Sequence, residues 1–146
     1  MSVGRICSRI VVTATPGESV RAGARRMAEH GVGTLVILSA DGANRAIGFV
    51  TDRDITLRCV AGNLDPDHTP LSGVMSHPVR SVHEDTPIEE AILEMSRGAI
   101  RRLVVTGAED RPVGILSLDD VLDLLIGEFG PVRKLLERQA PELLTM

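Results

Sequence analysis

An internal repeat is the feature that most limits how this chain of 146 residues can fold. The stretch "GFVTDRDI" at residues 48–55 returns in a degenerate form as "GILSLDDV" at residues 114–121, an offset of 66 positions. Earlier positions match at an offset of 68, from Cys7 against Met75 to Leu35 against Leu103. The offset changes between "SADGANRA" and "TGAEDRP", where turn-forming residues indicate a hairpin that tolerates insertion. The chain therefore contains one structural unit twice.

Each unit has the same predicted order of elements: strand, helix, strand, strand, helix. In the first unit we expect strands at 9–14, 33–38 and 46–51, and helices at 19–31 and about 52–61. In the second we expect strands at 77–82, 101–106 and 112–117, and helices at 87–98 and about 118–126. The second-unit helix places four apolar residues on one face, which are Ile88, Ala91, Ile92 and Met95.

Glycine and proline residues support these element boundaries. Gly31 and Gly98 stand where the first helix of each unit would stop, and Pro87 suits the first turn of the helix that follows it. Beyond the repeats, Pro131 is placed to open a short helix through Gln139, with an apolar stripe of Val132, Leu135 and Leu136.

The size of the unit predicts the architecture. A unit of roughly 55 residues buries too little surface to be stable alone, so the two copies must pack together. We predict an α/β (α+β) fold of two βαββα repeats, packed sheet to sheet about a pseudo-twofold axis. The expected division is a first repeat at 3–60, a connector at 61–70, a second repeat at 71–126 and a helical tail at 127–146.

Composition limits both the core and the ligands. The chain has two Phe and no Tyr or Trp, so the core must be aliphatic and a planar ligand would lie between aliphatic side chains. Met27 and Met95 are expected core residues, and Cys7 and Cys59 are expected to be buried free thiols. A net charge of −4 disfavours nucleic acid as a partner. No signal peptide or apolar run of about 20 residues is visible, which favours a cytoplasmic protein without a membrane partner.

No pattern in the sequence indicates catalysis or a metal site. We find no nucleophile beside a base and no glycine-rich phosphate loop, so no catalytic residue is predicted. The histidines lack the spacing of metal ligands and are expected at the surface, namely His30, His68, His77 and His83.

The repeated hydroxyl-x-x-Asp run, preceded by "MAEHGVGTLVI" and "MSRGAIRRLVV", resembles a tandem pair of CBS domains, the Bateman module. The resemblance covers residues 3–126, and the connector "AGNLDPD" looks like that of small stand-alone bacterial members. It implies a non-enzymatic regulatory module, often a homodimer, that requires no cofactor. Such modules bind adenosine-containing ligands (AMP, ADP, ATP, NAD or S-adenosylmethionine) in clefts between the repeats. Val36 and Val104 depart from the pattern, since many members have proline there.

The resemblance also implies which residues line the clefts, each cleft taking its Asp from one repeat and its base-lining edge from the other. The hydroxyl and carboxylate positions are Thr51, Asp54, Ser117 and Asp120. The base-lining positions are Val32, Gly33, Ile100 and Arg101. The edges of the first strands add Val12, Thr13, Arg80 and Ser81.

Elementary chemistry allows two interpretations of the repeated run. A carboxylate can accept hydrogen bonds from both hydroxyls of a ribose, and the free N–H groups at a helix start favour phosphate. The same Thr-x-x-Asp and Ser-x-x-Asp spacing is also a capping box, which starts a helix without any ligand. The alternative to a nucleotide sensor is therefore a structural dimerisation or interaction module with vestigial pockets, which would act on an unidentified protein partner.

Charge predicts that the two clefts differ. Arg101 and Arg102 are the phosphate candidates, and alternation along a strand predicts that only one of them reaches the cleft. The first repeat has Gly33 and Thr34 at the equivalent places, so its side of the other cleft lacks a cation. Other charged residues are expected at the solvated surface, namely Arg25, Arg26, Asp52, Arg53, Arg97 and Asp119.

Overall fold

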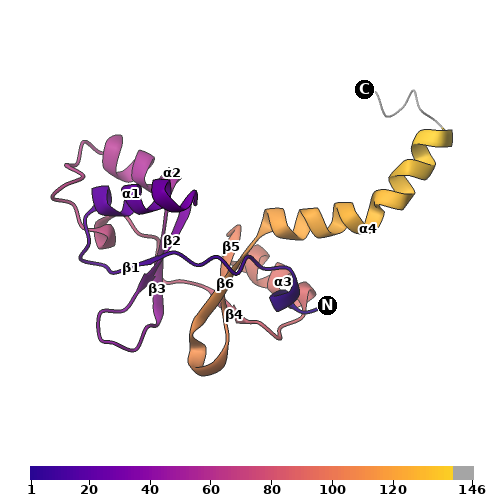
Figure 1. Cartoon of the computed structure of the whole chain (residues 1–146), viewed down its shortest axis with the longest axis horizontal. Coiled ribbons are helices and arrows are strands. Elements are labelled where there is room, and N and C mark those ends of the chain that lie inside the picture. Colours follow the sequence, from indigo (N-terminus) through magenta and orange to yellow (C-terminus); the bar gives the residue numbers. More distant parts are fainter. Residues whose placement is uncertain (140–146) are drawn as a thin grey trace.

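The computed structural model describes residues 1–139, which form two halves of the same topology (Figure 1). One sheet contains β1 (Thr13–Ala14), β2 (Thr34–Leu38) and β3 (Ala46–Thr51), and the other contains β4 (Ser81–His83), β5 (Arg102–Thr106) and β6 (Pro112–Ser117). In each sheet the first strand runs parallel to the middle strand and the third runs antiparallel to it. The register shifts after the equivalent residues Ile37 and Val105, so even this irregularity repeats.

Helices accompany both sheets. The first half has α1 (Val20–His30) and α2 (Asp52–Asp54), which continues as a π-helical segment over Ile55–Val60. The second half has α3 (Ile88–Gly98) and the long α4 (Leu118–Gln139). Short 3-10 helices occupy Val3–Arg5, Leu71–Gly73 and Ala108–Asp110. The two predicted βαββα units are therefore present in the predicted order.

The ends of the first helix in each half follow the usual capping preferences, except that an alanine takes the left-handed position in the second half. The Ser19 hydroxyl accepts a hydrogen bond from the Ala22 N–H (3.1 Å), and Gly31 closes α1 with a left-handed φ of 64°. In the second half α3 ends at Gly98 as predicted, but the left-handed residue is Ala99, with φ of 48°. Pro87 stands one residue ahead of the first turn, at the N-cap.

The core consists of two aliphatic clusters, one in each half. Met27 and Met95 are buried as predicted, and the buried apolar residues include no aromatic side chain among those described. Of the four apolar residues predicted on the inner face of α3, Ile88, Ala91 and Met95 are buried. Ile92 is 38% exposed, because the sheet covers a narrower strip of the helix than the spacing suggested.

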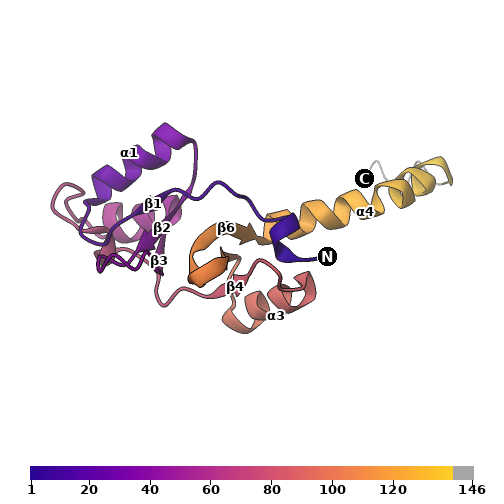
Figure 2. The same cartoon turned by 60° about the horizontal axis from the view of Figure 1, so that its bottom comes forward.

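Each cluster includes a segment from the opposite half of the chain. Val3 is fully buried in the second cluster, and its N–H donates to the Thr86 carbonyl (2.8 Å). Leu71 and Val74, which precede the second sheet, are buried in the first cluster. Figure 2 shows the N-terminal segment crossing from beside α4 to β1. The two halves therefore hold each other through exchanged segments.

The exchange explains why the first strands are shorter than predicted. Ser8 pairs with Ile115 of β6, and Ser76 pairs with Phe49 of β3, instead of lengthening their own strands. As a result β1 has two residues and β4 has three.

Helix α4 also differs from the prediction. A helix ending near 126 and a separate one beginning at Pro131 were expected, but one helix runs through Pro131 to Gln139. The helix bends in its second half (Figure 1), as expected where a proline cannot donate to the preceding turn. Residues 140–146 of the predicted tail lie outside the described residues.

The two cysteines form no disulfide. Cys59 is buried and Cys7 is half-buried, and both are free thiols; burial raises the pKa of the Cys7 thiol. Among residues 1–139, no cluster of His, Cys, Asp and Glu could hold a metal ion. Over the same range, no helix has the length and apolar character needed to span a bilayer.

Candidate functional site

Both copies of the hydroxyl-x-x-Asp run form complete capping boxes. Thr51 Oγ1 accepts from the Asp54 N–H (3.1 Å), and Asp54 Oδ2 accepts from the Thr51 N–H (2.9 Å). Ser117 and Asp120 repeat this arrangement at the start of α4 with the same two distances. In each box the hydroxyl hydrogen remains for another partner. The second carboxylate oxygen of Asp54 lies 3.7 Å from Arg58 Nη2, a long ion pair that leaves it room to accept a further hydrogen bond. A cap and a ligand contact can therefore coexist on these residues.

A cavity of about 600 Å³ lies between the halves and includes the Asp54 box. The first half contributes Phe49, Thr51, Arg53 and Asp54 to its lining. The second half contributes two segments, residues 76–80 and 98–102. Six of the predicted site residues are brought together here: Thr51, Asp54, Arg80, Ile100, Arg101 and Arg102. The volume is within the usual range for small-molecule sites.

Positive charge dominates this cavity, since four arginines line it against the single carboxylate of Asp54. Arg80 contacts Glu94 (3.3 Å), and Arg101 lies 3.6 Å from Asp119. Arg53 and Arg102 form no ion pair with any side chain that the structure describes.

One prediction about these arginines was wrong. Arg101 and Arg102 both line the cavity, because β5 begins only at Arg102 and the alternation of a strand does not apply to Arg101. Arg53 is exposed to solvent as expected, and the first turn of α2 also places it at the edge of the cavity.

Gly98 has a spatial role at this cavity. A Cβ at residue 98 would lie 2.7 Å from Arg80 Nε and 2.8 Å from its Cδ. The glycine therefore leaves the space in which the Arg80 side chain lies across the end of α3. Its φ is not the reason for its presence, since the left-handed position belongs to Ala99.

The pseudo-equivalent cavity at the Asp120 box is smaller, about 220 Å³. Its lining contains no cation and consists of Ser8, Ile10, Val32, Gly33, Thr34, Ile115, Ser117 and Asp120. Two predicted residues, Val12 and Thr13, line an adjoining depression that shares Ile10 with this cavity.

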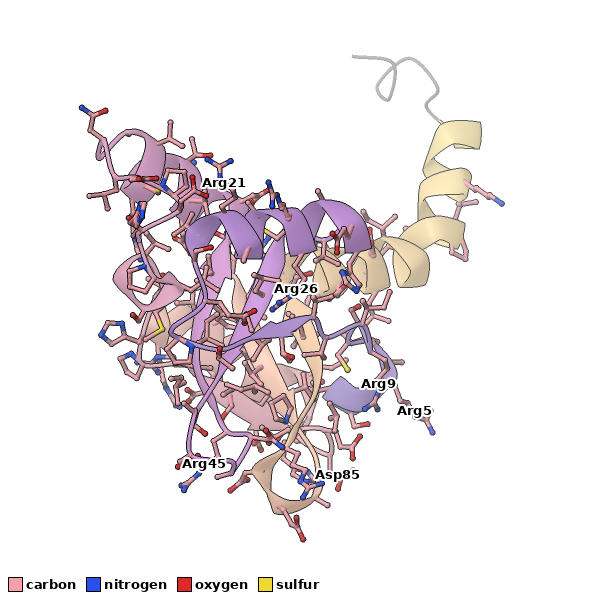
Figure 3. All side chains as sticks on the ribbon, turned by 60° about the vertical axis from the view of Figure 1, so that its left-hand side comes forward. Arg5, Arg9, Arg21, Arg26, Arg45 and Asp85 are labelled. Atoms are coloured by element: carbon pink, nitrogen blue, oxygen red, sulfur yellow. The ribbon has the colours of Figure 1, made fainter. Side chains whose placement is uncertain are left out.

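The arginines of that depression are already paired. Arg26 forms an ion pair with Glu18 and donates to the Thr13 carbonyl (2.9 Å), and Arg9 pairs with Glu84 (3.0 Å). Figure 3 labels both arginines, with Arg26 between α1 and β1 and Arg9 on the N-terminal segment. Hydrogen bonding and charge from Arg26 lower the pKa of Glu18 to about 2. Arg26 is therefore a structural ion-pair partner instead of the solvated charge expected from the sequence.

One predicted residue lies apart, and several lining residues were not predicted. Ser81, the first residue of β4, lines a separate recess against α3. His77, Pro78, Val79 and Ala99 line the larger cavity without having been singled out. Pairing of Ser76 with Phe49 brings the segment 77–79 there, and no local pattern indicates that pairing.

Comparisons with known proteins agree with this geometry. The CBS domain model matches residues 3–60 and 71–127. An uncharacterized protein of Methanopyrus kandleri is 34% identical over 124 residues, covering 85% of this chain. The chain spans only 62% of that relative's length.

Two solved structures share the fold. A CBS domain protein from Pyrobaculum aerophilum complexed with AMP is 31% identical, with a TM-score of 0.72 over 82% of this chain and 89% of that one. A CBS domain pair in complex with 5'-methylthioadenosine and S-adenosyl-L-methionine is 26% identical, with a TM-score of 0.75 over 88% of this chain and 98% of that one. With a family match in both halves and the fold of known pairs, this chain belongs to the CBS domain family as a tandem pair.

Proposed function

We propose that this protein is a non-enzymatic regulatory module that binds an adenosine-containing nucleotide in the cavity at Asp54. One observation carries the proposal: the cavity joins the Thr51–Asp54 helix start of one half to the guanidinium groups of the other. The related structures hold AMP in one case and 5'-methylthioadenosine and S-adenosyl-L-methionine in the other, which supports an adenosine ligand in general.

The lining residues divide into three chemical roles. The second oxygen of Asp54 accepts from the ribose hydroxyls, as a carboxylate with two acceptor oxygens is suited to do. Val79 and Ile100 offer the aliphatic surface against which an adenine packs, since the described lining includes only one aromatic residue, Phe49. Arg101 and Arg102 bind the phosphate, for which a guanidinium is a strong donor.

Charge selects among adenosine ligands. Two of the four lining guanidinium groups, Arg53 and Arg102, are in no described ion pair, and the lining has one carboxylate, so AMP, ADP or ATP is favoured over S-adenosylmethionine, whose sulfonium is itself a cation. The cavity at Asp120 is smaller and lacks a lining cation, so a charged nucleotide binds there weakly or not at all. We therefore propose one strong site per chain.

Calorimetric titration with AMP, ADP, ATP, NAD and S-adenosylmethionine tests the proposal. Arg101→Ala and Arg102→Ala should each weaken AMP binding by about ten-fold or more, the usual effect of losing a hydrogen bond to a charged group. If both variants keep full affinity, the assignment of phosphate to this cavity is wrong.

The two capping boxes supply a matched control. Asp54→Ala and Asp120→Ala each remove one equivalent cap bond of 2.9 Å, so both should lose about 1 kcal/mol of stability. Only Asp54→Ala should abolish nucleotide binding. Equal losses of binding in the two variants would contradict a single strong site.

A second candidate function is a structural interaction module with vestigial pockets. It is favoured by the completeness of both capping boxes, which satisfy the helix starts without a ligand. A ligand that binds the native state must raise the melting temperature. Melting temperatures that stay unchanged across the five nucleotides would favour this second function.

A further inference from the structure

Arg58 contacts both the carboxylate of the candidate site and the segment that crosses to the other half. Its Nη1 donates to the Val74 carbonyl (2.9 Å), and its Nη2 lies 3.7 Å from Asp54 Oδ1. Val74 is 1% exposed, and no other described group donates to its carbonyl oxygen. Arg58 is not among the residues that line the cavity. It therefore acts on the cavity from behind, through two neighbours.

The two oxygens of Asp54 are held in different ways. Oδ2 accepts from the Thr51 N–H (2.9 Å), which closes the capping box. Oδ1 faces Arg58 at a distance too long for a hydrogen bond, so the attraction orients the carboxylate without using this oxygen as an acceptor. The Asp54 side chain is 14% exposed, so water screens it less than a carboxylate at the open surface. Arg58 thus leaves Oδ1 oriented and available for a hydroxyl group.

The second contact of Arg58 lies where the opposite wall of the cavity begins. Val74 packs in the first core cluster, and two residues later Ser76 pairs with Phe49 of β3. Residues 76–80 then line the same cavity as Asp54. A ligand held between this segment and Asp54 needs a fixed distance between them. Because one guanidinium contacts both, Arg58 sets that distance.

The second half has a different residue and a different backbone at the equivalent place. The repeat offset of 66 places Leu124 opposite Arg58, and a leucine cannot pair with Asp120. Ile55–Val60 is π-helical, with the Ala61 N–H donating to the Thr56 carbonyl (2.9 Å), whereas residues 121–126 belong to the α-helix α4. Single π-helical turns are often found at functional sites. The contact of Arg58 therefore distinguishes the box at the larger cavity from its repeat.

We propose that Arg58 is a positioning residue for the nucleotide, which orients Asp54 toward the ribose hydroxyls and fixes the start of the wall at residues 76–80. The inference rests on the proposed function, in which Asp54 accepts from the ribose. It adds a determinant of ribose recognition that lies outside the cavity lining. Because Arg58 itself contacts no ligand, its loss should weaken recognition of the ribose hydroxyls specifically.

Calorimetry with AMP and 2′,3′-dideoxy-AMP on the full chain isolates this effect. The ratio of the two affinities measures recognition of the hydroxyls, and a change in protein charge cancels from it because both ligands carry the same phosphate. In Arg58→Met, which keeps an unbranched side chain without the charge, we expect the ratio to fall about ten-fold, as for the loss of a hydrogen bond to a charged group. Arg25→Met is the matched control, since Arg25 is exposed on α1 and its loss should leave the ratio unchanged.

The outcomes separate this inference from the proposed function. If Arg58→Met weakens AMP and the dideoxy ligand equally, Arg58 has only a structural or long-range charge effect and the proposal is wrong. Arg58→Lys keeps the charge but not the fork that serves two contacts, so its ratio should also fall. A ratio fully retained in Arg58→Lys would show that charge alone is sufficient. If neither ligand binds the unmodified chain, the proposed function itself fails.

Hydrogen exchange without any ligand tests the contact with the wall. In Arg58→Met the Val74 carbonyl loses its donor, so the Ser76 N–H, which donates to the Phe49 carbonyl (2.8 Å), should exchange about five-fold faster. The equivalent pair in the other crossing segment, the Ser8 N–H and the Ile115 carbonyl (2.9 Å), should keep its rate. Arg58 is 47% exposed, so the variant is expected to fold, and circular dichroism checks this. Unchanged exchange at Ser76 would refute the contact's role whether or not a nucleotide binds.

Discussion

Leu71→Ala should cost the first half much of its stability, although residue 71 precedes the second sheet in the chain. Leu71 is fully buried in the first cluster, and it lies so close to α1 that a Cβ on Gly23 would be 2.8 Å from its Cδ2. Removing a buried leucine side chain loses its transfer free energy and leaves a cavity. Together these should lower the free energy of unfolding by about 3–4 kcal/mol where the surrounding backbone cannot move in to fill the cavity. In a domain of this size that lowers the melting temperature by roughly 10 °C.

Urea denaturation followed by far-ultraviolet circular dichroism measures this loss, because the chain has no Trp or Tyr for fluorescence. The control is Leu64→Ala in the same connecting region, where the side chain is 45% exposed and less than about 1 kcal/mol should be lost. Equal losses at the two positions would show that the exchanged segment is not part of the first core. Val3→Ala, in the opposite exchange, should cost about 2 kcal/mol.

Further predictions concern the left-handed backbone at Ala99, the acid sensitivity of the Glu18–Arg26 ion pair, and the packing of Gly114 against the N-terminal segment. Ala99→Gly should raise the free energy of unfolding by about 1 kcal/mol in urea, because Ala99 holds a left-handed φ of 48°. Arg26 lowers the pKa of Glu18 from 4.5 to about 2. The ion pair between them therefore contributes its full stability above pH 4.5, and this contribution is lost as the pH falls toward 2. On acidification from neutral pH, the free energy of unfolding should therefore fall less for Glu18→Gln than for the unmodified chain, as measured by urea denaturation at each pH. An equal fall in the two proteins would contradict this prediction. Gly114→Ala would place a Cβ 2.8 Å from the Ser8 carbonyl oxygen. We expect it to lower the free energy of unfolding by about 1–3 kcal/mol in the same urea assay. An unchanged urea midpoint would show that the N-terminal segment around Ser8 moves aside at no cost.

The two capping boxes show how similar local chemistry can lead to different functions. Asp54 and Asp120 make the same hydrogen bonds to their own helix starts. They differ in what the opposite half brings to them, which is a set of arginines in one case and Val32, Gly33 and Thr34 in the other. The difference in proposed affinity between the sites therefore comes from the partner half and not from the repeated motif.

Features that depend on near neighbours along the chain, or on the period of the sequence, could be predicted from the sequence. The hydroxyl and carboxylate of each box are three residues apart, and this spacing alone closes the box whatever surrounds it. Gly31 ends α1 because only a residue tolerant of positive φ fits there. The repeat and the aliphatic composition predicted two similar halves with cores that lack aromatic residues, and the resemblance predicted a cleft shared between them.

Which distant segments meet could not be predicted in this way, because it depends on how the two halves pack. Val3 and Leu71 enter the opposite cores through pairings across the halves, and the free energy of such contacts depends on surfaces that no short window contains. The same crossing brings the segment 77–79 to the cavity, while the start of β4 leaves Ser81 outside it. Whether an exposed charged side chain such as Arg53 also borders a cavity depends on what packs opposite it, and the opposite half of the chain decides that.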